Sequence, residues 1–268
     1  VGKDGDIFAT GVCTATSFVG DGSNLTGLTS GLSSDSDGNT IGGTNAGDSI
    51  TTGTNNTVIG KDAGTAITTG DQNTAVGSGA LDANTTANNN TAVGYQSLTT
   101  NSTGASNSAL GRRTLRLNTT GGNNVAVGYQ ALEANTTASD NTAVGYNALL
   151  SNTTGTKCVA VGAYALDANT TADSNTAIGY QSLSANTTGY QNTAVGEQSL
   201  ILNTTGYRNT AIGFESLEDN TTGNYNTGLG YGSLANNTTA DYNVAIGYET
   251  LKVNTTGAQN AAVGAHAL

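Results

Sequence analysis

The sequence predicts an all-β fold, a parallel β-solenoid or β-roll of 17-residue coils, and three observations support this. A glycine returns every seventeen residues from Gly43 to Gly264. One unit, N-T-A-V-G-Y-x-(A/S)-L-x-x-N-T-T-(G/A)-x-x, recurs around it across residues 39–268. Val, Ile and Leu recur at fixed places in that unit. A short fixed period indicates an array whose units bury apolar edges on one another, here an extended rod of roughly 67 Å at about 4.8 Å per coil.

The repeated glycine holds position five, counted from the opening Asn of each unit. It follows a short extended segment, and a site with no substitute requires a positive φ or a close backbone approach. We therefore predict a corner there. These corner glycines are Gly43, Gly60, Gly77, Gly94, Gly111, Gly128, Gly145, Gly162, Gly179, Gly196, Gly213, Gly230, Gly247 and Gly264. The Gly or Ala at position fifteen, as at Gly189 and Gly206, is interpreted as the next corner.

Positions four and nine carry the large aliphatic residues and are predicted to form two apolar ladders, the core. Representative members are Val76, Leu81, Val93, Leu98, Val127, Leu132, Val144, Leu149, Ile178, Leu183, Ile212 and Leu217. Because side chains alternate along a strand, the Ala at position three is expected on the opposite face. A small residue there predicts close approach by another chain; a plain exposed strand site is the alternative, which the poor strand propensity of Ala disfavours.

Asn opens thirteen of the fourteen units, and a second Asn begins the N-T-T triplet. Identical amides one coil apart predict hydrogen-bonded ladders. The N-T-T ladder comprises Asn84, Asn135, Asn152, Asn169, Asn186, Asn203, Asn220, Asn237 and Asn254. These triplets are also formal N-glycosylation acceptors. Regular Thr columns also suggest ice binding as a function. That function needs a flat Thr face, whereas alternation places the first Thr of the triplet opposite the other two residues.

Two structural alternatives stay open. The span Tyr-x-Ala-Leu-x-x-Asn has room for a short helical turn in each coil, although about nine residues between glycines are few for a stable helix. A triple β-spiral woven from three chains has the same alternation and turns as a solenoid. Neither the handedness nor the choice between closed and woven coils follows from the sequence.

Three segments are predicted along the chain. Residues 39–72 are atypical capping repeats, because Gly47 and Gly64 replace the Leu of position nine while Ile50 and Ile67 replace the second Asn. Residues 73–268 form the regular array. Residues 1–38 lack the period; within them 11–28 predict two short strands around a Gly-Asp-Gly turn, and 29–38 a linker. The chain starts without Met and stops within a unit, so we expect a piece of a longer protein.

Charge and composition argue against several functions. The net charge is −11 with only eight basic residues, so nucleic acid is not an expected partner, and the basic cluster of Arg112, Arg113 and Arg116 is interpreted as a solvated edge. No apolar stretch is long enough to predict membrane insertion. Cys13 and Cys158 lie too far apart in an extended array to pair within one chain. An interchain bridge at Cys13 is the alternative to free thiols.

The sequence predicts no enzyme, no metal site and no cofactor. The sole histidine, His266, is interpreted as a surface residue, and Asp35-Ser-Asp37-Gly-Asn39 resembles a calcium loop that lacks its downstream Glu. A depolymerase would need paired carboxylates in a groove. The acids do not recur at a fixed spacing; examples are Glu133, Asp167, Glu215 and Glu218.

Aromatic residues share position six and form a candidate surface-binding column. The column comprises Tyr95, Tyr129, Tyr146, Tyr180, Tyr231 and Tyr248, joined by Phe214. Exposed aromatics would stack on a cell-surface glycan. Packing against a neighbouring chain or over a coil corner is the favoured interpretation.

Two resemblances follow from these motifs. The segment Asn175–Gly179, N-T-A-I-G, is similar to the N-S-x-A-I-G motif of trimeric autotransporter adhesin heads (the YadA-like family), although that family repeats at about fourteen residues. That resemblance implies a left-handed parallel β-roll, three chains side by side and an adhesive surface. The array at 124–138 looks more closely like arrays of phage tail-fibre-like proteins, which often precede a self-cleaving chaperone domain. The segment Thr14–Gly27 also resembles N-terminal segments of that group.

Function is therefore expected to be structural and extracellular. The leading hypothesis is the shaft of a homotrimeric phage tail fibre or similar appendage that presents a receptor-binding tip. The alternative is a bacterial surface adhesin or self-assembling extracellular filament that binds a glycan, a receptor or like chains through its repeat surface. A downstream chaperone domain would favour the first, and a signal peptide with a membrane anchor the second.

Overall fold

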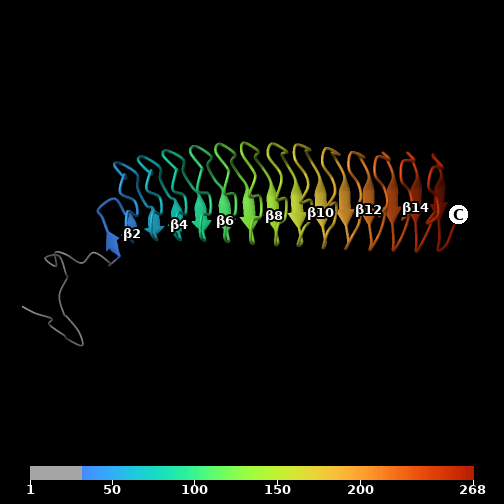
Figure 1. The fold of residues 1–268 in the computed structure, drawn as a ribbon, viewed down its shortest axis with the longest axis horizontal. Coiled ribbons are helices and arrows are strands. Elements are labelled where there is room, and N and C mark those ends of the chain that lie inside the picture. The colour runs from blue at the N-terminus through green and yellow to red at the C-terminus, as the bar shows by residue number, and fades with distance from the viewer. Residues whose placement is uncertain (1–31) are drawn as a thin grey trace, which may run out of the picture.

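The computed structural model describes residues 32–268, and within them the predicted parallel β-solenoid with 17-residue coils is confirmed. Figure 1 shows the strands side by side in chain order along a rod, with the C-terminus at the far end. The described residues contain no helix, so the coil has no helical turn. The predicted strands and turn at 11–28 lie outside the described residues.

Each coil contributes one three-residue strand to a single sheet. The strands are β1 Ser33–Ser34, β2 Thr40–Gly42, β3 Thr57–Ile59, β4 Thr74–Val76, β5 Thr91–Val93, β6 Ser108–Leu110, β7 Val125–Val127, β8 Thr142–Val144, β9 Val159–Val161, β10 Thr176–Ile178, β11 Thr193–Val195, β12 Thr210–Ile212, β13 Thr227–Leu229, β14 Val244–Ile246 and β15 Ala261–Val263. From β2 onward every pairing is parallel and joins residues seventeen apart, as Thr176 with Thr193.

The described part of the expected linker is instead the start of the sheet. β1 pairs antiparallel with β2. Between them the Asp35 carboxylate accepts the side-chain N–H of Asn39 (2.9 Å) and the backbone N–H groups of Asn39 (2.8 Å) and Asp37 (3.0 Å). These hydrogen bonds, with that of the Asn39 side chain first, lower the pKa of Asp35. The residues that resemble a calcium loop therefore close a turn.

The core corrects the sequence prediction at one of its two ladders. Leu at position nine is buried from Leu81 to Leu251, as predicted, but position three and not position four faces inward. Ala177 is fully buried, whereas Ile178 is 40% exposed. The predicted core residues Val76, Val93, Val127, Val144, Ile178 and Ile212 therefore lie on the outer face of the sheet.

The opening Asn explains why alternation runs this way. Asn175 is fully buried, and because neighbours along a strand alternate, Thr176 points outward, Ala177 inward and Ile178 outward. The Ala column is accordingly not a surface that another chain approaches. Its small side chains line the inside of the coil opposite the Leu of position nine, as Ala177 opposite Leu183, and the Leu side chain fills the remaining width.

The first two units keep this core volume with different residues. In the second unit Gly64 stands at the Leu position, and a Cβ built there would meet Ile67 Cδ1 at 2.8 Å and Val58 Cγ1 at 3.1 Å. Val58 and Ile67, both fully buried, thus supply the bulk that Leu and the small Ala supply elsewhere. The predicted shift of the apolar ladder at residues 39–72 is present.

The corner glycines have the geometry that the sequence requires at position five. Gly179 has a φ of +137°, and a Cβ there would lie 2.4 Å from the carbonyl oxygen of Gly196 in the next coil. The expected second corner is displaced. Gly189 does not have a positive φ, and the left-handed residue is Gln191 at position seventeen, with a φ of +57°.

Candidate functional site

Two buried amide ladders hold neighbouring coils together. In the N-T-T ladder, Asn152 Nδ2 donates to Asn135 Oδ1 (3.2 Å) and to the Gly155 carbonyl (2.9 Å), while its own Oδ1 accepts from Asn169 (2.9 Å). In the ladder of opening residues, the Oδ1 of each Asn accepts the backbone N–H of the next, as Asn192 N to Asn175 Oδ1 (2.9 Å). These amides satisfy polar groups that burial would otherwise leave unpaired.

The ladder decides between the interpretations of the N-T-T triplets. From Asn84 to Asn237 the amide nitrogens are fully buried and hydrogen-bonded, so the folded coil does not offer them to a glycosylating enzyme; Asn254 is half-buried. The first Thr of the triplet is also engaged, because Thr136 Oγ1 donates to the Thr153 carbonyl (3.0 Å). That column is therefore not a free row of hydroxyls, as ice binding would need.

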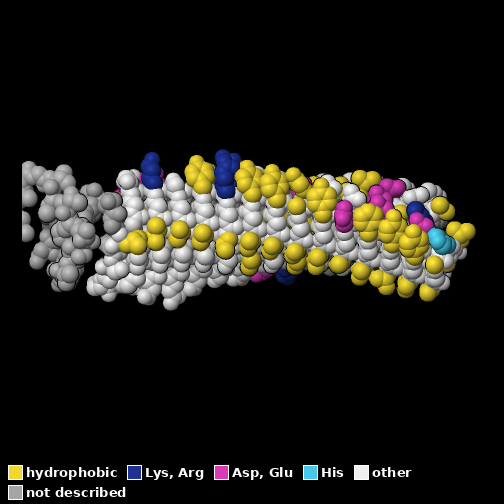
Figure 2. All heavy atoms as spheres, turned by 90° about the horizontal axis from the view of Figure 1, so that it is seen from below, with side chains coloured by type: hydrophobic (Ala, Val, Ile, Leu, Met, Phe, Trp, Pro, Cys, Tyr) yellow, Lys and Arg dark blue, Asp and Glu magenta, His cyan; other side chains and the backbone are white. Residues whose placement is uncertain are grey.

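The outward side chains of β2–β15 form the strand face, defined as the first and third residue of each strand. In β10 these are Thr176 and Ile178. No residue of this face is charged, and its third-residue column is Val, Ile or Leu from β3 to β15. Figure 2 shows these hydrophobic side chains as a row along the length of the array. Several large apolar members are about two-fifths exposed, among them Leu110, Ile178, Ile212 and Leu229.

The trailing edge is defined as positions six and seven of each unit, which follow the strand face. Its rings stack along the rod: Tyr129 with Tyr146 at 5.2 Å between centroids, and Tyr231 with Tyr248 at 5.1 Å. Where position six is Ala163, Tyr164 at position seven continues the column. Members that are two-fifths to half exposed are Tyr95, Tyr146, Tyr180, Tyr231 and Tyr248.

Stacking limits what the trailing edge can bind. A sugar that packs on an aromatic residue needs a free ring face, whereas Tyr146 is covered by Tyr129 on one side and approached by Tyr164 on the other. Arg112 lies over the rings of both Tyr95 (5.7 Å) and Tyr129 (5.3 Å). The column therefore presents ring edges and hydroxyls, and its stacking ties coils together.

A second aromatic cluster, which sequence reasoning missed, occupies the leading edge, defined as the last two positions of each unit. Tyr190 stacks on Tyr207 (4.8 Å) and Tyr225 on Tyr242 (4.9 Å). Arg208 lies over the Tyr225 ring (5.4 Å). The cluster moves from position sixteen at Tyr190 and Tyr207 to position seventeen at Tyr225 and Tyr242, so the repetition of a single position does not reveal it.

Among the acids weighed as catalytic candidates, Glu133 is the one that makes an ion pair within residues 32–268. Glu133 binds Arg116 at 2.6 Å and accepts a hydrogen bond from Gln130. Burial raises the pKa of Asp167. Burial, followed by the neighbouring charges of Glu215 and Asp219, raises the pKa of Glu218. Residues 32–268 hold no group of three His, Cys, Asp or Glu arranged to bind a metal.

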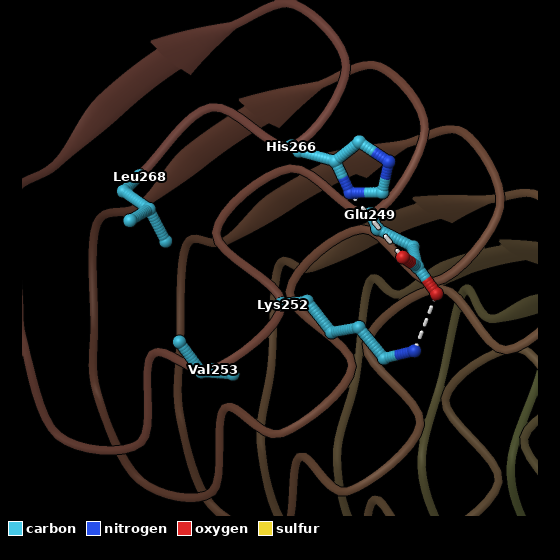
Figure 3. A pocket seen from close by; sticks show the side chains of 5 residues that line it. All are labelled: Glu249, Lys252, Val253, His266 and Leu268. Atoms are coloured by element: carbon cyan, nitrogen blue, oxygen red, sulfur yellow. Dashed lines mark hydrogen bonds and ion pairs between the residues drawn. The ribbon is translucent and has the colours of Figure 1, made fainter.

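A small pocket lies at the last coil, lined by Glu249, Lys252, Val253, His266 and Leu268 (Figure 3). Glu249 binds Lys252 Nζ (2.5 Å) and His266 Nδ1 (3.3 Å). Its carboxylate is thus already partnered within the chain, and His266 is a surface residue, as expected.

The described part of the chain shows no helix with the length and hydropathy of a membrane span. Comparisons with protein-family models, curated proteins and solved structures return no match.

Proposed function

We propose that the chain is the structural shaft of a homotrimeric fibre, a phage tail fibre or a similar extracellular appendage, which holds a receptor-binding tip away from its anchor. The observation that carries the proposal is the strand face. It is the long, uncharged and partly apolar surface of a chain whose net charge is −11. Copies of such a chain repel one another over charged surfaces, and this face lets them approach without that cost.

The apolar column also gives a favourable free energy of association. Burial of apolar surface contributes about 25 cal/mol per Å². Ile178, Ile212 and Leu229 each leave about two-fifths of their surface in water within one chain. Because the column continues over thirteen strands, small gains at each coil add along the rod. Contiguous exposed apolar patches are typical of interaction sites.

The resemblance to trimeric adhesin heads supports the number of chains, and the exposed apolar column of the strand face supports the proposed position of the interface. Three flat faces turned toward one axis would bury all three apolar columns. The Ala column no longer supports this assembly, because it lies in the core of each coil.

The test is the mass of the purified chain in solution and its response to charge on the strand face. We expect a mass three times 26.6 kDa. The double variant Ile178→Lys/Ile212→Lys should sediment as a single chain with an unchanged β-sheet circular dichroism spectrum, because lysines on one face would repel those of its neighbours.

Leu202→Lys is the matched control. Leu202 is 45% exposed but lies at position eleven, away from the strand face, so this variant should keep the wild-type mass. A wild-type mass of one chain at micromolar concentration would contradict the proposal, and so would a double variant that still forms trimers.

The alternative is an adhesin or self-assembling filament that binds through the repeat surface. The exposed hydroxyls and ring edges of the two tyrosine edges favour it. Binding of surface glycans by the isolated chain, lost when Tyr231 and Tyr248 are changed to Ser but kept in the Ile178→Lys/Ile212→Lys variant, would support this function over a passive shaft.

A further inference from the structure

The strand face leaves the register between neighbouring chains undetermined. Its columns repeat every seventeen residues, so moving one chain by a whole unit along another replaces each contact with a similar one between uncharged residues. The first column is mostly Thr, with Val125, Val159 and Val244 among its exceptions, and the third column is Val, Ile or Leu from β3 to β15. Strand arrays without distinguishing side chains are prone to slippage. Residues that break the repeat must therefore set the register, and the edges of the face carry them.

The two edges are chemically different, so the contacts between edges differ for parallel and antiparallel chains. Parallel chains that turn their strand faces to a common axis bring the leading edge of one beside the trailing edge of the next. Antiparallel chains about a two-fold axis across the rod bring like edges together. The charges on unlike edges thus report on the parallel arrangement.

Arg208 is the arginine of the leading edge and lies exposed at the end of its unit. Its Nε donates to Gln191 Oε1 (2.9 Å) and its guanidinium to the Tyr225 hydroxyl (2.6 Å). Both partners are neutral. Arg208 makes no ion pair with any carboxylate of residues 32–268 in its own chain, although these hydrogen bonds hold it in place.

Carboxylates stand at the matching level of the trailing edge. Glu197 is the acid of position six, where it interrupts the rings between Tyr180 and Phe214, and Glu215 follows at position seven of the next unit. These two bracket Arg208 in chain order. Elsewhere on positions six and seven, acids do not occur in successive units. Like Arg208, neither makes an ion pair within the described residues.

We propose that the chains lie parallel and in register, and that Arg208 of one chain, placed between Glu197 and Glu215 of its neighbour, sets that register. The proposal rests on the homo-oligomer proposed above. A slip of one unit leaves Arg208 beside one of the two carboxylates. A slip of two units leaves it beside neither, and in one direction brings it to the level of Glu249, whose carboxylate already binds Lys252 and His266 in its own chain. Exposed ion pairs contribute little free energy, but a small difference suffices because the strand face itself does not discriminate.

A second unit also carries opposite charges on its two edges, although both groups have partners within the chain: Lys61 lies 3.7 Å from Asp62, and Asp71 accepts hydrogen bonds from Thr54. Lys61 holds position six and Asp71 position sixteen of residues 56–72. Parallel chains in register bring these opposite charges to the same level as well. The two units lie far apart along the rod, so both pairs are satisfied together only in a parallel arrangement.

The experiment uses carbodiimide, which joins a lysine amine to a carboxylate as an amide with loss of water. The variant Arg208→Lys is assembled from a mixture of ¹⁴N- and ¹⁵N-labelled chains and cross-linked, and its peptides are identified by mass spectrometry. We expect cross-links from residue 208 to Glu197 or Glu215 in which the two peptides carry mixed labels. The variant Arg116→Lys is the matched control, because Arg116 binds Glu133 within one chain and its product should carry unmixed labels.

Charge exchange provides the second measurement. Arg208→Glu alone has no amine at position 208 and is the blank for this cross-link. Arg208→Glu with Glu197→Lys should give a mixed-label product between residues 197 and 208. A three-chain mass with mixed-label products only at other carboxylates would overturn the register and leave the trimer standing. A single-chain mass would overturn both proposals.

Discussion

The glycine after each strand combines two requirements that no other residue meets. Gly179 needs a φ of +137°, and the next coil leaves no space for a Cβ because the Gly196 carbonyl would lie 2.4 Å away. Position seven shows that a positive φ alone is not prohibitive. Gln181 and Gln198 adopt it in the left-handed region, where space is available. The invariance of position five therefore follows from the contact with the stacked coil.

The first prediction compares these two kinds of glycine. Gly179→Ala should cost roughly 3 kcal/mol or more, because it adds a backbone clash to an unfavourable φ. Gly232→Asn should be tolerated, because a Cβ at Gly232 meets only Glu249 Cγ at 3.5 Å and Asn accepts a φ of +56°. Thermal unfolding followed by circular dichroism measures both. Equal midpoints for the two variants would contradict the stacking argument.

Cys158 is the single interruption in the ladder of opening residues. Its backbone N–H still donates to Asn141 Oδ1 (2.9 Å), but it has no amide oxygen to offer the N–H of Asn175. The thiol is fully buried, and burial raises its pKa to about 11. The folded coil therefore keeps the thiol neutral.

The second prediction concerns pH. The ordinary pKa of the thiol is 9.0, so the unfolded chain ionises first as pH rises. The stability contributed by the neutral thiol is complete below pH 9 and is lost progressively toward pH 11, by about 2–3 kcal/mol. Cys158→Asn should be more stable and should lack this component. Denaturant midpoints of the wild-type protein and the variant are measured between pH 8 and 11. The tyrosines titrate in both proteins, so the difference between the two midpoints reports the thiol alone. Parallel pH curves would contradict the prediction.

At the element scale, each coil is narrow enough to hold one large side chain opposite a small one. Leu183 faces Ala177 in the regular units, whereas Val58 and Ile67 close the space above Gly64 in the second unit. Volume across the coil is conserved while its residues change, as expected for a close-packed interior.

The third prediction tests this compensation. Gly64→Leu alone should destabilise the chain by about 1–3 kcal/mol, because the new side chain overlaps Ile67 and Val58. Adding Val58→Ala and Ile67→Asn restores the residues of the regular unit and should recover most of that loss. Hydrogen exchange of the amides in residues 56–90 measures the local stability. A triple variant as unstable as Gly64→Leu would show that the first units differ for a reason other than volume.

At the scale of the whole molecule, the sheet is a one-dimensional array in which each strand pairs only with its neighbours. Stability is then a sum of coil and interface contributions rather than a property of one closed core. The fold should accept a change in the number of coils but not in their period.

The fourth prediction removes material from the middle of the rod. Deleting residues 175–191 takes out one whole unit and should let β9 pair with β11, with a rod shorter by about 4.8 Å. Deleting residues 175–190 leaves one extra residue, which shifts the buried and outward positions of that coil and should be strongly destabilising. Small-angle scattering gives the length, and circular dichroism gives the folded fraction. Equal stability of the two deletions would contradict the array description.

The sequence by itself determined the period, the strand, the corner at Gly179 and its equivalents, and both amide ladders, because each follows from a residue type repeated at one spacing. It did not determine which side of the three-residue strand faces inward. In Thr-Ala-Val, Thr and Val share one side of the strand and Ala takes the other, and the spacing does not say which side faces inward. The narrow coil filled by Leu183, together with the buried Asn175, places Ala177 inside. The outward position of the aliphatic column at position four was therefore decided by the tertiary structure alone. It also showed Tyr190, Tyr207, Tyr225 and Tyr242 as one cluster, because their contact depends on side-chain direction across coils and not on sequence position.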